Sequence, residues 1–251
     1  MPKKRADQLL VETGLCDDLE QARRCIMAGL VRVGADHVVK KPADTLAGGA
    51  DLRVVPRGEF VSRGAFKLLP ALDRFLPVLP ENTVALDLGA STGGFSDLLL
   101  QRGAVRVYAV DSGYGQLHYR LRRDPRVIVM ERTNARYLDS DAIPEKVHVL
   151  TADLSFIAVQ KVLARCAGFL RDGGWAFVLV KPQFQARRDE IEPGGVVRDE
   201  SVRQRCVSDI CSFGTEACGW RKIGVVESPI TGPAGNREYV AVFRNPPSGA
   251  S

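Results

Sequence analysis

The chain of 251 residues is 45% hydrophobic and 26% charged, with a formal net charge of +5, the balance of an ordinary globular protein. No apolar run approaches the ~18 residues that a membrane span needs, and the polar start "MPKKRADQLL" has no signal-peptide core. The six cysteines form no C-x-x-C pair and no metal-ligand spacing. We therefore expect a cytoplasmic monomer with reduced cysteines, no metal and no membrane contact; the positive charge suits a polyanionic partner without requiring one.

Residues 1–56 predict a compact module of two helices and a few short strands. The segments "RADQLLVETG" and "DLEQARRCIMAG" have the pattern of amphipathic helices. For the second, Asp18 is the expected N-cap, with Gln21 three residues later, and Gly29 is the expected C-cap. Short β-rich pieces follow, separated by turn residues: "LVRVG", "HVVK" and "DLRVV".

Basic side chains cluster in this module, at Lys3, Lys4, Arg5, Arg23, Arg24 and Arg32. Such a cluster is often only a solvated helix face, so charge alone leaves the choice open. The stretch "RADQLLVETGLCDDLEQARRCIMAGLVRVG", however, resembles the S4 RNA-binding domain. In that family the second helix and the following turn lie against structured RNA and contact mostly phosphates. The resemblance implies an α+β RNA-binding domain over residues 1–56, joined by a linker at 57–63 to the rest of the chain.

Residues 64–251 predict an α/β domain. From Thr83 onward, strand-like segments such as "VALDLG", "RVYAVD" and "FVLVKP" alternate with helical ones such as "GFSDLLLQRG". This alternation predicts a doubly wound, mostly parallel, Rossmann-like sheet with right-handed crossovers. Ligands of such sheets bind beyond the carboxyl ends of the strands.

The turn after the first of these strands, Gly89-Ala-Ser-Thr-Gly93-Gly94, limits the choice of ligand. It matches neither the P-loop nor the dinucleotide fingerprint, so it has no dedicated phosphate cradle. Asp87 precedes the turn, where it could meet an ammonium group. Asp111 ends the next strand, where an acidic residue takes ribose hydroxyls in such folds. An adenosine with an amino acid and no pyrophosphate fits this pattern, which points to S-adenosyl-L-methionine.

Charged residues flank three apolar strands, with Asp153 ending "VLTAD", Lys181 ending "FVLVK" and Glu238 starting the last strand. Taken singly, each is most simply a solvated strand end. In methyltransferase sheets, however, the last strand runs antiparallel, so all three would face the ligand crevice. Lys67 can join them from the helix "GAFKLLPALDRF", which we expect to pack onto the sheet through Phe66, Leu69, Leu72 and Leu76.

Seven segments in order resemble the motifs of TlyA-type ribosomal RNA 2′-O-methyltransferases, which carry an S4 domain ahead of an FtsJ-like catalytic domain: "VSRGAFKL", "DLGASTGGFSDLLLQRGA", "VDSGYGQL", "ERTNAR", "DLSFI", "VKPQFQ" and "GPAGNREY". The resemblance covers essentially the whole chain. It implies a catalytic Lys-Asp-Lys-Glu tetrad at Lys67, Asp153, Lys181 and Glu238. The cofactor residues that it implies are Gly89, Ser91, Thr92, Gly93, Gly94, Phe95, Asp111, Asn134 and Asp153.

The tetrad has a chemical rationale of its own. A ribose 2′-hydroxyl is a poor acid and must lose its proton as it attacks the sulfonium methyl group. A lysine amine can take that proton where burial or a second cation lowers its pKa. We expect Lys181 to be the base, Lys67 to tune it, and the two acids to orient them.

Other methyl acceptors fit less well. Methylation of a base amino group usually shows [DN]-P-P-[YF], where this chain has "DLSF". Cytosine C5 methylation needs a nucleophilic cysteine, and none lies within ten residues of Asp153 or Lys181.

Further RNA contacts are expected on the catalytic domain, at Arg63 and at Arg187 and Arg188. The last two begin a Pro/Gly-containing loop that could act as a lid. The segment "YRLRRDPR" adds four more arginines, and a solvated surface is the simpler explanation for both groups. The target nucleotide would have to flip out of its helix to reach the crevice.

The sequence thus predicts an S-adenosylmethionine-dependent 2′-O-methyltransferase of ribosomal RNA, acting on cytidine as the resemblance implies. The alternative is a non-catalytic RNA-binding or ribosome-assembly factor with a vestigial methyltransferase fold, and the intact tetrad argues against it. The haemolysin label of the family suggests a pore-forming role, but no stretch is long or apolar enough to span a bilayer.

Overall fold

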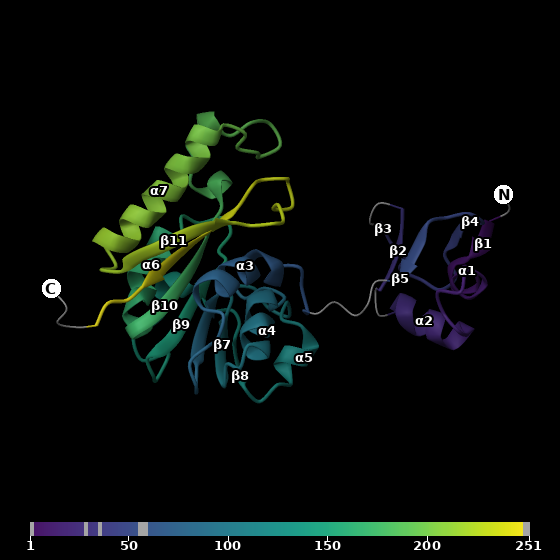
Figure 1. Ribbon diagram of the computed structural model, residues 1–251, viewed down its shortest axis with the longest axis horizontal. Coiled ribbons are helices and arrows are strands. Elements are labelled where there is room, and N and C mark those ends of the chain that lie inside the picture. The colour runs from purple at the N-terminus through teal and green to yellow at the C-terminus, as the bar shows by residue number, and fades with distance from the viewer. Residues whose placement is uncertain (1–2, 28–29, 35–36, 55–59, 248–251) are drawn as a thin grey trace. The chain divides into compact units, whose positions relative to one another are not determined.

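The structure, a computed structural model, describes residues 3–27, 30–34, 37–54 and 60–247. The chain forms two compact units, residues 1–59 and 60–251, and each is described separately (Figure 1). Of the expected linker, residues 57–59 lie outside the described residues, and residues 60–63 belong to the second unit.

The first unit combines two helices with short antiparallel strands. Its elements are α1 (Ala6–Glu12), α2 (Leu19–Met27), β1 (Lys3–Arg5), β2 (Val31–Val33), β3 (His37–Val38), β4 (Thr45–Ala47) and β5 (Leu52–Val54). β2 lies between β3 and β5, and β1 pairs with β4. The sequence predicted both helices and the strands β2, β3 and β5, but not how these strands pair. It did not predict the β1–β4 pair, because the polar residues of β1 give no alternating pattern.

Capping interactions set the ends of these helices. Asp18 Oδ1 accepts a hydrogen bond from the Gln21 amide at 2.7 Å, and Gln21 Oε1 accepts one from the Asp17 amide at 2.5 Å. This exchange satisfies free amides at the start of α2 and confirms Asp18 as its N-cap. Gly14 ends α1 with φ +71°. The predicted C-cap of α2, Gly29, lies outside the described residues.

The second unit is built on a seven-stranded sheet in the order β11-β12-β10-β9-β6-β7-β8. The strands are β6 (Val84–Leu88), β7 (Arg106–Val110), β8 (Val127–Met130), β9 (Val147–Ala152), β10 (Leu170–Val180), β11 (Arg221–Glu227) and β12 (Tyr239–Arg244). β6 is paired in parallel with β7 and β9, whereas β12 is antiparallel to β10. The predicted doubly wound sheet with an antiparallel last strand is confirmed. The start of β12 therefore lies at the carboxyl edge of β9 and β10.

Helices cover both faces of this sheet (Figure 1). The helices are α3 (Ala65–Phe75), α4 (Gly94–Gln101), α5 (Tyr119–Arg122), α6 (Gln160–Cys166) and α7 (Glu200–Glu216), with short 3-10 turns η1 (Ala135–Tyr137), η2 (Ala167–Phe169), η3 (Pro182–Phe184) and η4 (Arg188–Glu190). One apolar core contains buried residues of α3 and α4, and a separate one contains those of α6 and α7. This two-sided burial explains why the central strands are nearly continuous hydrophobic runs.

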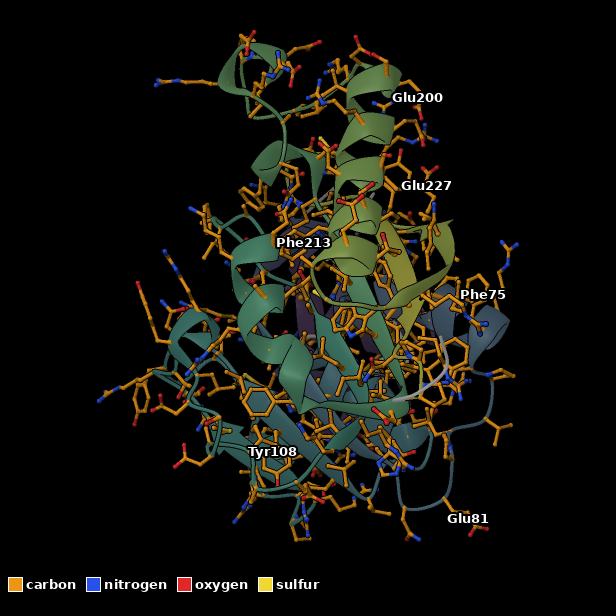
Figure 2. The ribbon with its side chains drawn as sticks, turned by 90° about the vertical axis from the view of Figure 1, so that its left-hand side faces the viewer. Phe75, Glu81, Tyr108, Glu200, Phe213 and Glu227 are labelled. Atoms are coloured by element: carbon orange, nitrogen blue, oxygen red, sulfur yellow. The ribbon has the colours of Figure 1, made fainter. Side chains whose placement is uncertain are left out.

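The packed face of α3 differs from the predicted one. Leu68 and Leu72 are fully buried, whereas Phe66, which we expected on that face, is 37% exposed. Phe66 instead meets the ring of Phe60 edge-on, with the ring centroids 5.4 Å apart. At the end of the helix, Phe75 lies so close to Gly224 of β11 that a Cβ there would come within 2.5 Å of the ring; Figure 2 shows this phenylalanine beside the sheet. The contacts of Phe66 and Phe75, near the two ends of α3, thus fix how the helix that carries Lys67 packs.

Asp87 ties the middle of the sheet together from a fully buried position. Its Oδ2 accepts a hydrogen bond from Ser96 Oγ of α4 at 2.6 Å, and its Oδ1 accepts one from Thr151 Oγ1 of β9 at 2.8 Å. Burial raises the pKa of this carboxyl from 3.8 to about 6, against the opposing effect of these two bonds. The folded state therefore binds a proton at Asp87 more tightly than the unfolded chain does.

The raised pKa of Asp87 predicts a specific pH dependence of stability. Because the folded pKa lies above the unfolded one, the free energy of unfolding should fall as the pH rises from about 4 to about 6. Asp87→Asn removes this titration. The free energy of unfolding of the mutant, measured relative to that of wild type, should therefore rise by about 1 kcal/mol from pH 5 to pH 8. Denaturant unfolding at both pH values measures the difference, with the exposed Asp139→Asn as a control. A constant difference between Asp87→Asn and wild type would contradict the assignment.

Candidate active site

A cavity of about 620 Å³ opens at the carboxyl edge of β6, β7 and β9. It has polar groups from the loops after these strands and apolar walls from Val110, Leu154, Ile157 and Val162. Five of the predicted cofactor residues line it, namely Gly89, Ser91, Asp111, Asn134 and Asp153. An apolar pocket with a few fixed polar groups suits a nucleoside-sized ligand.

Asp111 is the best-anchored carboxylate on the wall of this cavity. Its Oδ2 accepts a hydrogen bond from the Ser91 amide at 2.8 Å, and its Oδ1 accepts one from the Gly113 amide at 2.7 Å. These bonds join the glycine turn to the loop after β7. Each carboxylate oxygen has a further lone pair, so Asp111 keeps acceptor capacity for the hydroxyls of a ligand.

Glycine is required in the turn because other backbone approaches so closely. A Cβ on Gly89 would lie 2.3 Å from the carbonyl oxygen of Asp153, and one on Gly94 would lie 2.8 Å from the amide nitrogen of Ala65. Gly89 also has φ +81°, a conformation that favours glycine. The turn is thereby pressed against both Asp153 and the start of α3.

Two of the predicted cofactor residues, Asp87 and Gly93, line neither this cavity nor a smaller neighbouring cavity of about 260 Å³. The structure differs from the sequence-based expectation at Asp87, whose carboxylate points to Ser96 and Thr151 instead of toward a ligand. Gly93 precedes α4 with φ +96° and packs against Leu121. Both residues support the shape of the turn.

The four predicted tetrad residues come together at the carboxyl edge of the sheet. Lys67 Nζ lies 2.7 Å from Glu238 Oε2 and 3.9 Å from Asp153 Oδ2. Lys181 Nζ lies 2.5 Å from Asp153 Oδ1. Lys67 and Lys181 are buried, and Glu238 is fully so. Buried charges need partners, and here two ammonium and two carboxylate groups balance.

A second cavity of about 260 Å³ reaches the same group of charges. It is lined by Lys67 and Asp153, and also by the predicted cofactor residues Thr92, Gly94 and Phe95. It shares Gly89, Ser91 and Asp153 with the larger cavity. Asp153 thus lies where the two cavities meet.

The two lysines have different surroundings. Lys67 contacts two carboxylates, and each carboxylate stabilises an ammonium ion. Lys181 contacts one carboxylate and donates a hydrogen bond to Ser155 Oγ at 2.8 Å. Lys67 thus lies between two carboxylates, whereas Lys181 lies between one carboxylate and one hydroxyl.

The predicted RNA-binding residues of the first unit are mostly engaged in local ion pairs. Lys4 contacts Glu12 at 2.6 Å, and Arg24 contacts Glu20 at 2.6 Å. Arg5 and Arg23 both contact the buried Asp7, at 2.8 and 3.3 Å, and the pKa of Asp7 is lowered to about 2, chiefly by its hydrogen bond from Arg5. Lys3 is exposed on β1. The pairs of Lys4 and Arg24 are exposed on both sides and therefore weak, whereas Arg5 and Arg23 hold a buried carboxylate.

In the second unit, Arg63 lines the smaller cavity, and Arg187 and Arg188 are exposed at the start of the expected lid loop. The far end of that loop is fixed. Asn236 accepts from the Val197 amide at 2.9 Å and donates to the Gly195 carbonyl at 2.8 Å. Within the segment "YRLRRDPR", Arg122 pairs with Glu131, and Arg126 pairs with Asp124 at 2.7 Å.

Sequence reasoning missed several residues that line the cavities. The larger cavity includes Ser112, Gly113, Gln116, Thr133, Ser155 and Phe156, and the smaller one includes Ser62, Gly64 and Pro233. Most lie on loops that follow parallel strands, so their place after "YAVD", "VMER" and "LTAD" was a usable signal. For Pro233 the sequence signal was weaker, and consisted only of its place in the loop before Glu238.

Neither a metal centre nor a membrane span emerges from the described ranges. No three His, Cys, Asp or Glu side chains in them gather as metal ligands. No helix in the part of the chain that the structure describes is long and apolar enough to cross a bilayer.

Comparison with known proteins places the chain among methyltransferases. The FtsJ-like methyltransferase family matches residues 60–245. The 16S/23S rRNA (cytidine-2′-O)-methyltransferase TlyA of Mycobacterium tuberculosis is 45% identical over 96% of this chain and 90% of its own length. Hemolysin A of Brachyspira hyodysenteriae is 35% identical over 95% of this chain and 99% of its own. A solved structure of a candidate hemolysin from Streptococcus thermophilus has a TM-score of 0.73 at 39% identity, covering 98% of this chain and 90% of that one.

The match spans the second unit from Phe60, through the glycine turn and all four tetrad residues, to the end of β12. The motif resemblance had predicted the same family. The chain therefore belongs to the FtsJ-like methyltransferase family.

Proposed function

We propose that this protein transfers a methyl group from S-adenosylmethionine to the 2′-hydroxyl of a cytidine in ribosomal RNA. The observation that carries the proposal is the position of Asp153, between two buried lysines and at the meeting point of two cavities. The names of the relatives supply the substrate class, since the relative from Mycobacterium tuberculosis is a 16S/23S rRNA (cytidine-2′-O)-methyltransferase.

The larger cavity fits S-adenosylmethionine. Asp111 has free acceptor capacity for ribose hydroxyls, and Asn134 stands on the same wall. The turn at Gly89 and Ser91 offers backbone groups, while Ile157 and Val162 offer apolar surface for an adenine ring. When bound, this group supplies an electrophilic sulfonium methyl.

The smaller cavity fits the acceptor ribose. Lys67 and Asp153 line it, and Arg63 stands at its wall, where it suits a neighbouring phosphate. Lys181 takes the proton of the 2′-hydroxyl as the oxygen attacks. Lys67 remains an ammonium ion between Glu238 and Asp153 and stabilises the developing negative charge on the oxygen.

The first unit supplies RNA affinity in this proposal, as an S4-like domain over residues 1–56. Its exposed basic residues contact phosphates, and Arg187 and Arg188 add contacts beside the active site. We place the enzyme in the cytoplasm, where ribosomal RNA is assembled, and propose that it acts as a monomer. A non-catalytic RNA-binding role would not require the charge-balanced tetrad that the structure holds.

Lys181 variants test the base assignment. Lys181→Ala should reduce methyl transfer to ribosomal RNA by ~10² or more while cofactor and RNA binding stay near normal. Lys181→Arg should also fail, since a guanidinium stays protonated and cannot accept a proton. Transfer of a tritiated methyl group measures activity, and calorimetry measures cofactor binding. Near-normal turnover of the arginine variant would leave Lys181 only an electrostatic role.

Asp111→Ala tests the cofactor site. The carboxylate should make one or two charge-assisted hydrogen bonds to ribose, each worth roughly 1.5–3 kcal/mol. Calorimetric titration should therefore show binding of S-adenosylmethionine at least ~10-fold weaker than in wild type. Asp139→Ala, at an exposed carboxylate outside the cavity, should bind normally. Unchanged affinity in a folded Asp111→Ala protein would remove this residue from the site.

Salt dependence tests the role of the first unit. Each phosphate contact that is lost should lower the slope of log affinity against log salt by about 0.7–0.9. The double variant Lys3→Ala, Arg24→Ala should therefore bind ribosomal RNA more weakly and with a shallower slope, while its affinity for S-adenosylmethionine stays the same. Filter binding from 50 to 300 mM KCl measures the slope. The same slope as wild type would assign RNA binding to other residues.

A further inference from the structure

The amine of Lys181 has a hydrogen-bond partner that the mechanism above does not use. Its Nζ donates to Ser155 Oγ at 2.8 Å. Its other close neighbour is Asp153 Oδ1, at 2.5 Å. That oxygen has no hydrogen-bond partner of good geometry among the described residues, so Asp153 acts on the amine mainly through its charge. The directional contact is the one to Ser155.

Direction matters for a base. A neutral lysine amine has two N–H bonds and one lone pair, and it is free to rotate about its last C–N bond. It accepts a proton only along the lone pair, so that lone pair must point at the hydroxyl. An acceptor that holds one N–H stops this rotation.

We propose that Ser155 is a positioning residue, whose hydroxyl holds one N–H of Lys181 and turns the lone pair toward the 2′-hydroxyl of the substrate. The proposal rests on the methyl transfer proposed above. In the step itself, the proton leaves the 2′-oxygen for Lys181 Nζ. The amine becomes an ammonium with three N–H bonds, of which Ser155 still accepts one.

The backbone around Ser155 is built to hold this contact. The next residue, Phe156, has φ +63°, a rare conformation for a bulky side chain that persists only where surrounding structure fixes it. The ring of Phe156 lies 5.2 Å from that of Phe184, three residues after Lys181. Although Phe156 is 91% exposed, this ring contact links the loop after β9, which carries Ser155, to the loop after β10, which follows Lys181.

A hydroxyl suits this position better than a second acid. A carboxylate would stabilise the ammonium form of Lys181, as the two carboxylates beside Lys67 do for that residue. The Ser155 hydroxyl accepts the N–H without adding a negative charge. Ser155 is also exposed and lines the larger cavity, where we place the methyl donor.

The test compares Ser155→Ala with Ser155→Thr, which keeps the hydroxyl, and uses Ser208→Ala on the exposed face of α7 as the matched control. We expect Ser155→Ala to lower kcat for ribosomal RNA methylation ~10-fold or more, with KM for RNA and Kd for S-adenosylmethionine within ~3-fold of wild type. Ser155→Thr should recover most of the lost kcat. Ser208→Ala should match wild type throughout.

Several results would overturn the proposal. They are an unchanged kcat in Ser155→Ala, a rise in KM alone, a loss of cofactor binding, or a threonine variant as slow as the alanine variant. Each would leave Ser155 as a binding, structural or neutral residue. Wild type serves as the separate check on the function itself, because a wild-type protein that forms no 2′-O-methylated nucleoside would contradict the methyl transfer before Ser155 is considered.

Discussion

The proposed active site depends on one carboxylate, Asp153, which lies between the amines of two buried lysines at the end of β9. Without Asp153, Lys67 and Lys181 would be two like charges at one buried edge, and the folded state would be strained by their repulsion. With it, the lysines lie on opposite sides of the same carboxylate. Glu238 completes the balance, and it reaches this edge only because β12 runs antiparallel to β10.

The same residue couples the charged cluster to the cofactor cavity. The Asp153 carbonyl lies so close to Gly89 that no side chain fits between them, and both residues line both cavities. Asp87, at the end of the strand before the turn, accepts hydrogen bonds from α4 and β9 and so connects the elements that flank the turn. In the proposed function, this backbone packing brings the methyl donor and its acceptor to one place, and accurate positioning of this kind lowers a barrier by several kcal/mol.

Much of this arrangement could be predicted from the sequence, because strong local signals carry it. The seven strands of the sheet are short apolar runs, and each tetrad lysine or acid flanks a strand or stands on a helix with a clear apolar face. The gathering of Asp153, Lys181 and Glu238 followed from the antiparallel last strand that is expected of a methyltransferase sheet. The Asp18–Gln21 exchange at the start of α2 followed from residue spacing.

What could not be predicted depends on tertiary packing. The ring contact of Phe66 with Phe60 outweighs its place in the helical pattern, so the packed face of α3 turned out differently. Asp87 was expected to meet the ligand because of its position before the turn, but the polar partners that it finds lie on α4 and β9. The contact of Ser155 with Lys181 depends on the positive φ of Phe156, which no residue preference of phenylalanine indicates.

The chemical identity of the methylated nucleoside tests the central claim most directly. Unmethylated ribosomal subunits would be incubated with the wild-type protein and S-adenosylmethionine carrying a tritiated methyl group. The RNA would then be digested to nucleosides and separated by chromatography. The proposed function, with Lys181 as the base and the relatives' substrate as the acceptor, predicts label that co-elutes with 2′-O-methylcytidine. Label in a base-methylated nucleoside, or no label from a protein that binds both the cofactor and the RNA, would contradict the account.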